Sequence, residues 1–325
     1  MDVRKQILRL RGGIAIMFGL LSCIGVNIGT IGCLGVEDFP RDRVALCSTG
    51  STPKIYAYLW DGSDFQQIND GTNIDKSGSY CALNATDLLI YKKDLEKICI
   101  YRWNGSKWFL IKESSEFVSN NTIWSACSRL SNNSIALIRD YNVTTNYLET
   151  YTFDGSDWSK TGNSFNFGSP ASFSDISRLS DTDVVIWDAG DICTYTWDGT
   201  DWSLVNNKLS ISDASFSKLC SLDSSTCAFL NINTTAGTEK LETYSWDGTD
   251  WSKVGNSLSL SYNATYFTGD ITSIDDSTVI VFSCDNGATQ YYLRTYSWDG
   301  TDWTQVGNDG TPASYSSDGK IEYLK

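Results

Sequence analysis

Histidine, the side chain most often used as a general base near neutral pH, does not occur among the 325 residues. Its absence excludes Ser-His-Asp and Cys-His catalysis and His-ligated zinc. Enzyme chemistry would have to rely on carboxylates, and the 39 acidic residues exceed the 25 basic ones. The resulting net charge of −14 repels phosphate and argues against nucleic-acid binding. The sequence therefore favours a non-enzymatic protein without a metal or cofactor.

The ten cysteines are the other groups that could do chemistry, but they show no CxxC spacing and no dense disulfide framework. Cys99 and Cys193 each stand four residues before the first aromatic anchor of a repeated motif, which predicts small buried strand residues. Cys220 and Cys227 flank a predicted turn and are the best disulfide candidate. Their offset is diagonal, so the spacing leaves their redox state open.

The repeated motif has the order Tyr, one spacer, Trp or Phe, Asp or Asn, Gly, two residues, then Trp or Phe. Its six copies are anchored on Tyr58, Trp60 and Gly62; Tyr101, Trp103 and Gly105; Tyr151, Phe153 and Gly155; Tyr195, Trp197 and Gly199; Tyr244, Trp246 and Gly248; and Tyr296, Trp298 and Gly300. Successive copies lie 43 to 52 residues apart, a period typical of propellers, solenoids or arrays. Ten of the twelve Trp stand in the motif, so we expect these aromatics to pack between stacked sheets.

Each copy predicts a hairpin, because Tyr and Trp two apart share one face of a strand and Asp-Gly suits a tight turn. Before each hairpin, one strand ends at a Leu or Ile, a polar turn follows, and an apolar strand begins, as at Leu179 and Val184. Four strands in about 45–50 residues is the size of a propeller blade. We therefore predict an all-β, six-bladed propeller over residues 43–325.

The two ends of this region predict how the ring closes. Val44 and Leu46 belong to a second strand with no first strand before it, whereas Ile321 and Leu324 belong to a first strand with nothing after it. If the C-terminal strand completes the first blade, no sheet edge stays free. The alternative is an open array of repeats.

Residues 1–36 form a separate segment, with a basic start followed by 25 uncharged residues from 12 to 36, and residues 37–42 form a linker. The apolar stretch is long enough to span a membrane with its N-terminus inside. We favour a retained anchor, inserted in a membrane or buried among other virion proteins. A cleaved secretory signal and an ordinary core segment are the alternatives.

The full pattern, as in Tyr244 to Asn256, resembles repeats of kelch-like and FG-GAP-like propellers of bacteria and phages, above all those of marine bacteriophage tail-associated proteins. The resemblance covers residues 43–325. FG-GAP blades can carry calcium, but the turns here offer only acid pairs such as Asp247 and Asp250, too few oxygen ligands. Sialidase propellers need converging arginines; here Arg129 and Arg178 occupy equivalent positions, which we expect near the central channel. Their counterparts in the other blades do not continue the arginine set: Ala82, Ser221, Ser273 and Tyr323.

Three functions are compatible with this fold, because propellers host all of them. The favoured one is a structural or binding propeller on the virion surface, in a phage tail, fibre or capsid, that presents loops to a host glycan or protein. The alternative is a membrane-anchored or secreted cell-surface propeller that binds glycans or proteins. A glycan-processing enzyme that uses carboxylates is the third and the least favoured.

Overall fold

The computed structural model describes residues 42–48, 52–74, 78–92, 94–115, 125–141, 145–168, 174–188, 190–205, 208–211, 216–233, 236–260, 269–284, 290–312 and 319–324. The chain divides into two units, 1–41 and 42–325. The first unit, and with it the predicted anchor, lies outside the described residues. Within the described ranges, no helix has the length and apolar character that a membrane span requires.

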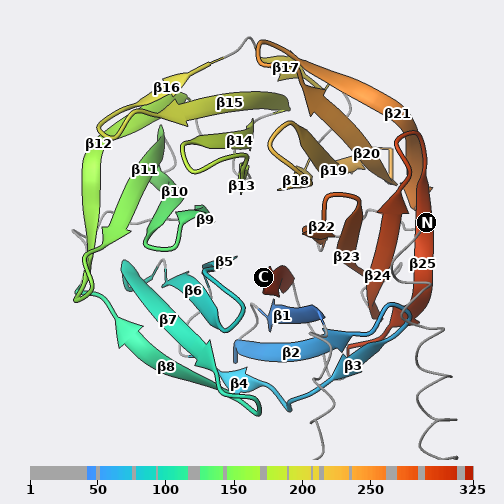
Figure 1. Cartoon of the computed structure of the whole chain (residues 1–325), viewed down its shortest axis with the longest axis horizontal. Coiled ribbons are helices and arrows are strands. Elements are labelled where there is room, and N and C mark those ends of the chain that lie inside the picture. Colours follow the sequence, from blue (N-terminus) through green and yellow to red (C-terminus); the bar gives the residue numbers. More distant parts are fainter. Residues whose placement is uncertain are drawn as a thin grey trace, which may run out of the picture. The chain divides into compact units, whose positions relative to one another are not determined.

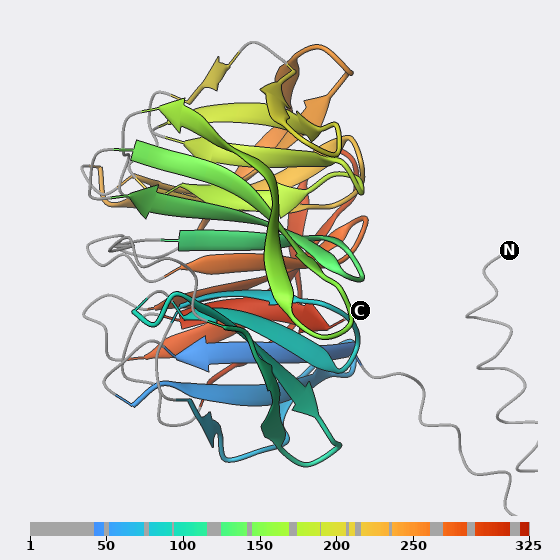
Figure 2. The same cartoon turned by 90° about the vertical axis from the view of Figure 1, so that its left-hand side faces the viewer.

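The second unit is a ring of six antiparallel sheets, which confirms the predicted all-β six-bladed propeller (Figure 1). Figure 2 shows the ring from the side, with the strands running between its two faces. We number the blades 1 to 6 from the sheet that contains β1. Each blade has four strand positions from the centre to the rim.

For each strand position, the strands are given in order from blade 1 to blade 6. The innermost strands are β26 (Gly319–Leu324), β5 (Ser79–Ala82), β9 (Ser125–Ser131), β13 (Asp175–Arg178), β18 (Phe216–Ser221) and β22 (Asp270–Asp275). The second strands are β1 (Asp42–Ser48), β6 (Asp87–Lys92), β10 (Ser134–Tyr141), β14 (Asp183–Asp188), β19 (Thr226–Asn233) and β23 (Thr278–Cys284). The third strands are β2 (Lys54–Trp60), β7 (Lys97–Trp103), β11 (Thr145–Phe153), β15 (Asp191–Trp197), β20 (Thr238–Trp246) and β24 (Tyr291–Trp298).

The outermost position differs most among the blades. Its strands are β3 (Phe65–Gln67) with β4 (Thr72–Asn73), β8 (Trp108–Glu113), β12 (Trp158–Gly168), β16 (Trp202–Leu204) with β17 (Leu209–Ser210), β21 (Trp251–Leu260) and β25 (Trp303–Gly310). In blades 1 and 4 this strand is therefore broken into two short pieces. The break in blade 1 lies beside a groove at the rim that is described below.

The ring closes as the sequence predicts, because β26 pairs with β1 in blade 1 (Figure 1). Val44 lies opposite Tyr323 and Leu46 lies opposite Ile321 in this antiparallel ladder. Leu324 faces Arg43 across the same ladder and is buried. The C-terminal strand thus supplies the innermost strand that blade 1 lacks.

The core consists of six apolar clusters, each shared by two neighbouring blades. The motif tyrosines at the six repeat positions are all buried in it: Tyr58, Tyr101, Tyr151, Tyr195, Tyr244 and Tyr296. The motif glycines sit in the hairpin turns at φ values of 97° to 101°: Gly62, Gly105, Gly155, Gly199, Gly248 and Gly300. The propeller therefore has no single central core, and its stability depends on the contacts between blades.

The two aromatics of the motif are not equally buried. Among the first aromatics, Trp60 and Trp103 are buried, whereas Trp197, Trp246, Trp298 and Phe153 are half-buried. The second Trp is buried wherever it occurs: Trp108, Trp158, Trp202, Trp251 and Trp303. Within a hairpin the two rings lie against each other, for example Trp246 and Trp251 with centroids 5.6 Å apart.

A Gly-Asn pair in three outermost strands locks one blade onto the next, and we call this contact the latch. In blade 5, Gly255 takes a φ of +63° and bulges β21 outward. The backbone N–H of Asn256 donates to Thr301 O of blade 6 (2.8 Å), and its side-chain Nδ2 donates to Asp302 Oδ1 (2.9 Å). The absence of a Cβ is required, since one on Gly255 would lie 2.3 Å from that same carbonyl oxygen and from the ring of Trp298.

The same latch joins blade 3 to blade 4 through Gly162 and Asn163, and blade 6 to blade 1 through Gly307 and Asn308. In blade 1 the corresponding stretch is the strand break between β3 and β4. In blade 2 the sequence there is Lys112-Glu113, and Ser115 hydrogen-bonds Asp157 of blade 3 instead. Blade 4 is broken between β16 and β17 at this position. The latch therefore joins three seams, 3–4, 5–6 and 6–1, whereas the seams 1–2, 2–3 and 4–5 have other contacts or a broken outer strand.

Candidate functional site

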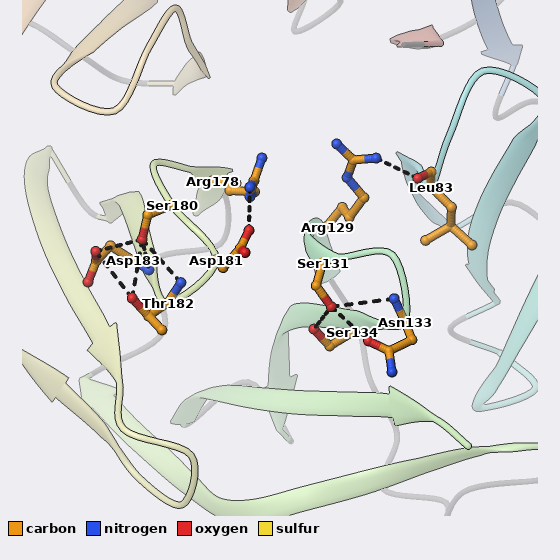
Figure 3. Close-up of polar contacts among 10 residues, drawn as sticks. All are labelled: Leu83, Arg129, Ser131, Asn133, Ser134, Arg178, Ser180, Asp181, Thr182 and Asp183. Atoms are coloured by element: carbon orange, nitrogen blue, oxygen red, sulfur yellow. Dashed lines mark hydrogen bonds and ion pairs between the residues drawn. The ribbon is translucent and has the colours of Figure 1, made fainter. Parts of the chain in front are cut away.

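One candidate site is the mouth of the central channel, where the six innermost strands end. A cavity of about 170 Å³ lies there, lined by one equivalent residue from each blade: Ala82, Arg129, Arg178, Ser221, Ser273 and Tyr323. The prediction that Arg129 and Arg178 occupy equivalent positions near the channel is thereby confirmed. Figure 3 shows both side chains pointing toward the centre of the ring. We call this cavity the channel mouth.

The two arginines have different partners within the mouth (Figure 3). Arg129 donates from Nη1 to Leu83 O of blade 2 at 2.6 Å, and no described carboxylate forms an ion pair with it. Arg178 pairs through Nη2 with Asp181, an exposed residue of its own turn. The Nε of Arg178 is buried without a hydrogen-bond partner in the described part of the chain. Both arginines line the cavity, and each guanidinium group has N–H donors beyond the one that these contacts use.

Glu322 is the carboxyl group in the wall of this cavity. Burial, and then the negative charge of Asp270, hold the pKa of Glu322 well above its usual range. The backbone N–H of Ala82 donates to the carboxyl group, which opposes this shift. The raised pKa favours the neutral form, so Glu322 cancels less of the positive charge in the mouth than an exposed carboxylate would.

Toward the other end of the innermost strands, four successive blades contribute alternating charges. Asp175, Lys218, Asp270 and Lys320 stand at one equivalent strand position. The Nζ of Lys218 lies 3.7 Å from Asp175 Oδ1, and Asp270 Oδ2 accepts the backbone N–H of Ile321 at 2.8 Å. Burial raises the pKa of Asp270 to about 6. These acids thus link neighbouring blades and offset the lysines beside them.

The cysteines in the described ranges are buried, and no disulfide joins two of them. The disulfide between Cys220 and Cys227, which the sequence left open, is not formed in this structure: as the diagonal offset indicated, Cys227 lies opposite Ser221 and Cys220 opposite Ala228. Cys99 and Cys193 are fully buried strand residues, as predicted. The thiol of Cys81 instead touches Cys127 of the next blade, and this hydrogen bond, with burial, raises the pKa of Cys81 well above its usual value.

The motif acids act within their own turns. Asp247 Oδ1 accepts the backbone N–H groups of Thr249 and Asp250 at 2.8 Å each. Asn104 makes the same two bonds in blade 2, so the turn needs a side-chain oxygen and not a charge. In blade 3 the corresponding hydrogen bonds lower the pKa of Asp154 to about 2, and the one from the backbone N–H of Asp157 contributes most. Within the described residues, no group of three acids or cysteines could hold a metal ion.

A second candidate site lies at the rim, where the latch is missing between blades 1 and 2. A groove of about 1030 Å³ is lined there by the broken outer strand of blade 1, residues 66–72, and by Ser106 and Lys107 of the blade 2 turn. We call it the rim groove. Instead of a latch, Thr72 Oγ1 accepts the backbone N–H of Trp108 across the seam at 3.2 Å.

Hydrogen bonds hold the side chains at the floor of the rim groove, whereas those at its edge are exposed. Asn69 Oδ1 accepts the backbone N–H of Ala57 at 2.7 Å, and Gln67 bridges Tyr58 OH (3.0 Å) to Asn69 O (2.6 Å). The side chains of Gln66, Asp70 and Lys107 are exposed and make no ion pair or hydrogen bond with a described residue. An amide, a carboxylate and an ammonium group are therefore open to a ligand on an ordered floor.

Sequence reasoning did not find the rim groove. The signal was present, since Val-Gly-Asn follows the second aromatic in some copies, whereas blade 1 has Ile68-Asn69-Asp70-Gly71. Asn69-Asp70 replaces Gly-Asn at the latch position, but only a structure reveals that Gly-Asn contacts the neighbouring blade.

Comparison with solved structures finds propellers of similar fold, among them fungal and other lectins. The fungal lectin of Aleuria aurantia, described as a six-bladed β-propeller with a novel mode of fucose recognition, is 15% identical with a TM-score of 0.52; the match covers 85% of this chain and 98% of the lectin. The SapL1 lectin, solved with α-methyl fucoside, is 15% identical with a TM-score of 0.53, covering 84% and 97%.

An enzyme fold also matches. A putative 6-phosphogluconolactonase from Bacteroides fragilis is 6% identical with a TM-score of 0.55, and the match covers 89% of this chain and 99% of that one. At these identities the likeness concerns the fold alone. No protein-family model and no curated protein matches the sequence, so the predicted resemblance to phage tail repeats gains no support.

Proposed function

We propose that this propeller is a non-enzymatic glycan-binding module whose main binding surface is the rim groove. The observation that carries the proposal is the set of unpaired polar side chains, Gln66, Asp70 and Lys107, above the ordered floor of that groove. Sugars present hydroxyl groups that donate and accept hydrogen bonds, and amide, carboxylate and ammonium groups together complement both roles. The volume suits an oligosaccharide-sized ligand.

The likeness to fucose-binding lectins supports this reading over an enzymatic one. Glycoside hydrolysis generally uses a pair of carboxyl groups that flank the scissile bond. The rim groove has Asp70 as the carboxylate among its described lining residues. Binding without turnover is therefore the function that this groove supports best.

The location of the propeller is a separate proposal. Residues 1–36 would hold it on a membrane or on a virus particle, with the rim groove free to meet a host glycan. The lectin likeness supports the cell-surface alternative and adds nothing for the virion. Mass measurement and fractionation of native protein test this point: a chain that begins near residue 35 and is free in solution would rule out the anchor.

A glycan array tests the binding function, with fucosylated and other neutral oligosaccharides included. We expect the full chain to bind a defined subset, and Gln66→Ala or Lys107→Ala to weaken that binding. The matched control is Thr304→Ala, because Thr304 follows the second aromatic of blade 6 as Gln66 follows that of blade 1, but at a latched seam. Equal loss with Thr304→Ala, or no binding by the parent, would contradict the proposal.

A further inference from the structure

The channel mouth carries an excess of positive charge in a protein that is acidic overall. Arg129 and Arg178 come from neighbouring blades and both point into the same 170 Å³ cavity. A guanidinium group has five N–H donors, and each arginine uses one of them in the contacts described above. The cavity therefore faces a surplus of charged donors.

Arg178 supplies a second, independent observation. Its Nε is buried and has no hydrogen-bond partner among the described residues, although its Nη2 is held by Asp181. A buried donor without an acceptor costs about 1–3 kcal/mol, and more when the group is charged. Because this Nε is buried, an acceptor that enters the mouth would meet the exposed part of the Arg178 side chain, 37% of its surface. The carrier of that acceptor would have to be small, because the cavity is far smaller than the rim groove.

The rest of the wall presents hydroxyl groups. Ser221 Oγ donates to Ser177 Oγ at 3.0 Å, and Ser128 and Ser273 also line the cavity. The two guanidinium groups could bind an oxyanion, and the serine hydroxyl groups could bind ring hydroxyls. The cavity therefore suits a ligand that carries both an oxyanion and a polyhydroxylated ring. The planar fork of arginine fits a carboxylate in particular, because two parallel N–H···O bonds can form.

We propose that the channel mouth is a second binding site, which takes the carboxylate of a terminal acidic sugar between Arg129 and Arg178. This rests on the proposed glycan-binding function only for the choice of a sugar as the carrier. It differs from the rim groove in position, in charge and in the size of ligand that it admits.

Calorimetric titration of the full chain with glucuronate, glucose and inorganic sulfate tests this site. We expect glucuronate to bind and glucose not to bind. Arg129→Gln and Arg178→Gln should each weaken glucuronate by about tenfold or more, since a charge-assisted hydrogen bond contributes about 1.5–3 kcal/mol. Lys107→Gln in the rim groove should leave glucuronate binding unchanged.

Arg178→Lys keeps the charge but loses the fork, so it should fall between the parent and Arg178→Gln and guards against a folding defect in the latter. Sulfate that competes as well as glucuronate would overturn the assignment to a carboxylate sugar. Equal binding of glucose, or glucuronate binding that survives both arginine substitutions, would overturn the site itself. Loss of neutral-glycan binding in Lys107→Gln, with glucuronate intact, would separate the two sites.

Discussion

Trp303 of blade 6 donates its indole N–H to Thr243 Oγ1 of blade 5 at 2.9 Å, and both side chains are buried. The same bond joins Trp251 to Thr194 (2.7 Å) and Trp202 to Thr150 (3.0 Å). Each Thr directly precedes a motif Tyr, so one repeat unit provides the acceptor and the next provides the donor. At these three seams a polar bond therefore lies inside an apolar contact, whereas the buried indole N–H groups of Trp108 and Trp158 have no partner among the described residues.

Breaking this bond should destabilise the ring. Thr243→Val would leave the Trp303 N–H buried without a partner, at a cost of about 1–3 kcal/mol. Thr295→Val is the matched control, because Phe65 stands at the Trp position of blade 1 and Thr295 Oγ1 has no partner among the described residues. Thermal melts should show a loss for the first variant and none for the second. Equal melting temperatures would mean that the bond adds nothing.

The latch should be intolerant of a side chain at its glycine. Gly255→Ala would place a Cβ 2.3 Å from Thr301 O, whereas a Cβ on Gly248 meets nothing within 4 Å. Both glycines have positive φ values, so Gly248→Ala measures the backbone strain alone, about 1–3 kcal/mol. We expect chemical denaturation to show a clearly larger loss for Gly255→Ala. A smaller loss than for Gly248→Ala would contradict the latch.

Two buried glutamates of blade 5 should affect stability in opposite directions. Burial raises the pKa of Glu239 to about 7, and Arg294 only partly opposes this shift. Glu239 therefore contributes stability below about pH 4.5 that is lost as the pH rises toward 7. Glu239→Gln should stabilise the protein at pH 8, by up to an amount on the order of 3 kcal/mol.

Glu242 is the matched control for that measurement. Burial opposes its ionisation, but hydrogen bonds from Lys253, Asn231 and Ser257 outweigh burial and lower its pKa. Its contribution is present above about pH 4.5 and is lost as the pH falls. Glu242→Gln should therefore destabilise the protein at pH 8. Denaturation curves at pH 5 and pH 8 would give the change in unfolding free energy for both variants. We expect changes of opposite sign at pH 8, and changes of the same sign would refute the prediction.

Ring closure gives a further prediction. Removal of residues 319–325 would take away β26 and leave β1 with an unpaired edge next to its buried face. Exposed edges pair with other chains, so the truncated protein should aggregate or lose cooperative melting. Removal of Lys325 alone is the control. Light scattering would detect the change, and a soluble monomer with the parent melting temperature would show that closure is dispensable.

Much of the fold could be predicted from the sequence because its signals are local and repeated. The Asp-Gly turns determine the hairpins, and the unmatched strands at Val44 and Ile321 predict the closure that the structure shows. The half-burial of Trp246 and Trp298 was not predictable, because the packing around the first aromatic differs between blades: Gly255 lies against half-buried Trp298, whereas Gly307 lies against buried Trp60. The rim groove was missed because the difference between Asn69-Asp70 and the Gly-Asn of other copies is visible in the sequence, but the role of Gly-Asn in joining two blades is not.

The site residues were predictable only in part. Arg129 and Arg178 could be aligned to one strand position, and alignment alone places equivalent residues around one channel. The unpaired Nε of Arg178 and the free edge of the rim groove required side-chain geometry. The sequence gives the positions of charged residues but not which of them pair in the folded chain, so the side chains without a partner could not be predicted.

The latches have a consequence for the order of folding. Asn163 and Asn256 reach partners 38 and 46 residues away, whereas Asn308 reaches Asp64, 244 residues away. Joining the longer loop costs roughly 1.5 kcal/mol more in chain entropy than joining a 46-residue loop. Contacts between distant residues slow folding, because this entropy is lost before the contact forms. We therefore expect neighbouring blades to dock along the chain first and the seam between blades 6 and 1 to form last, as the rate-limiting step.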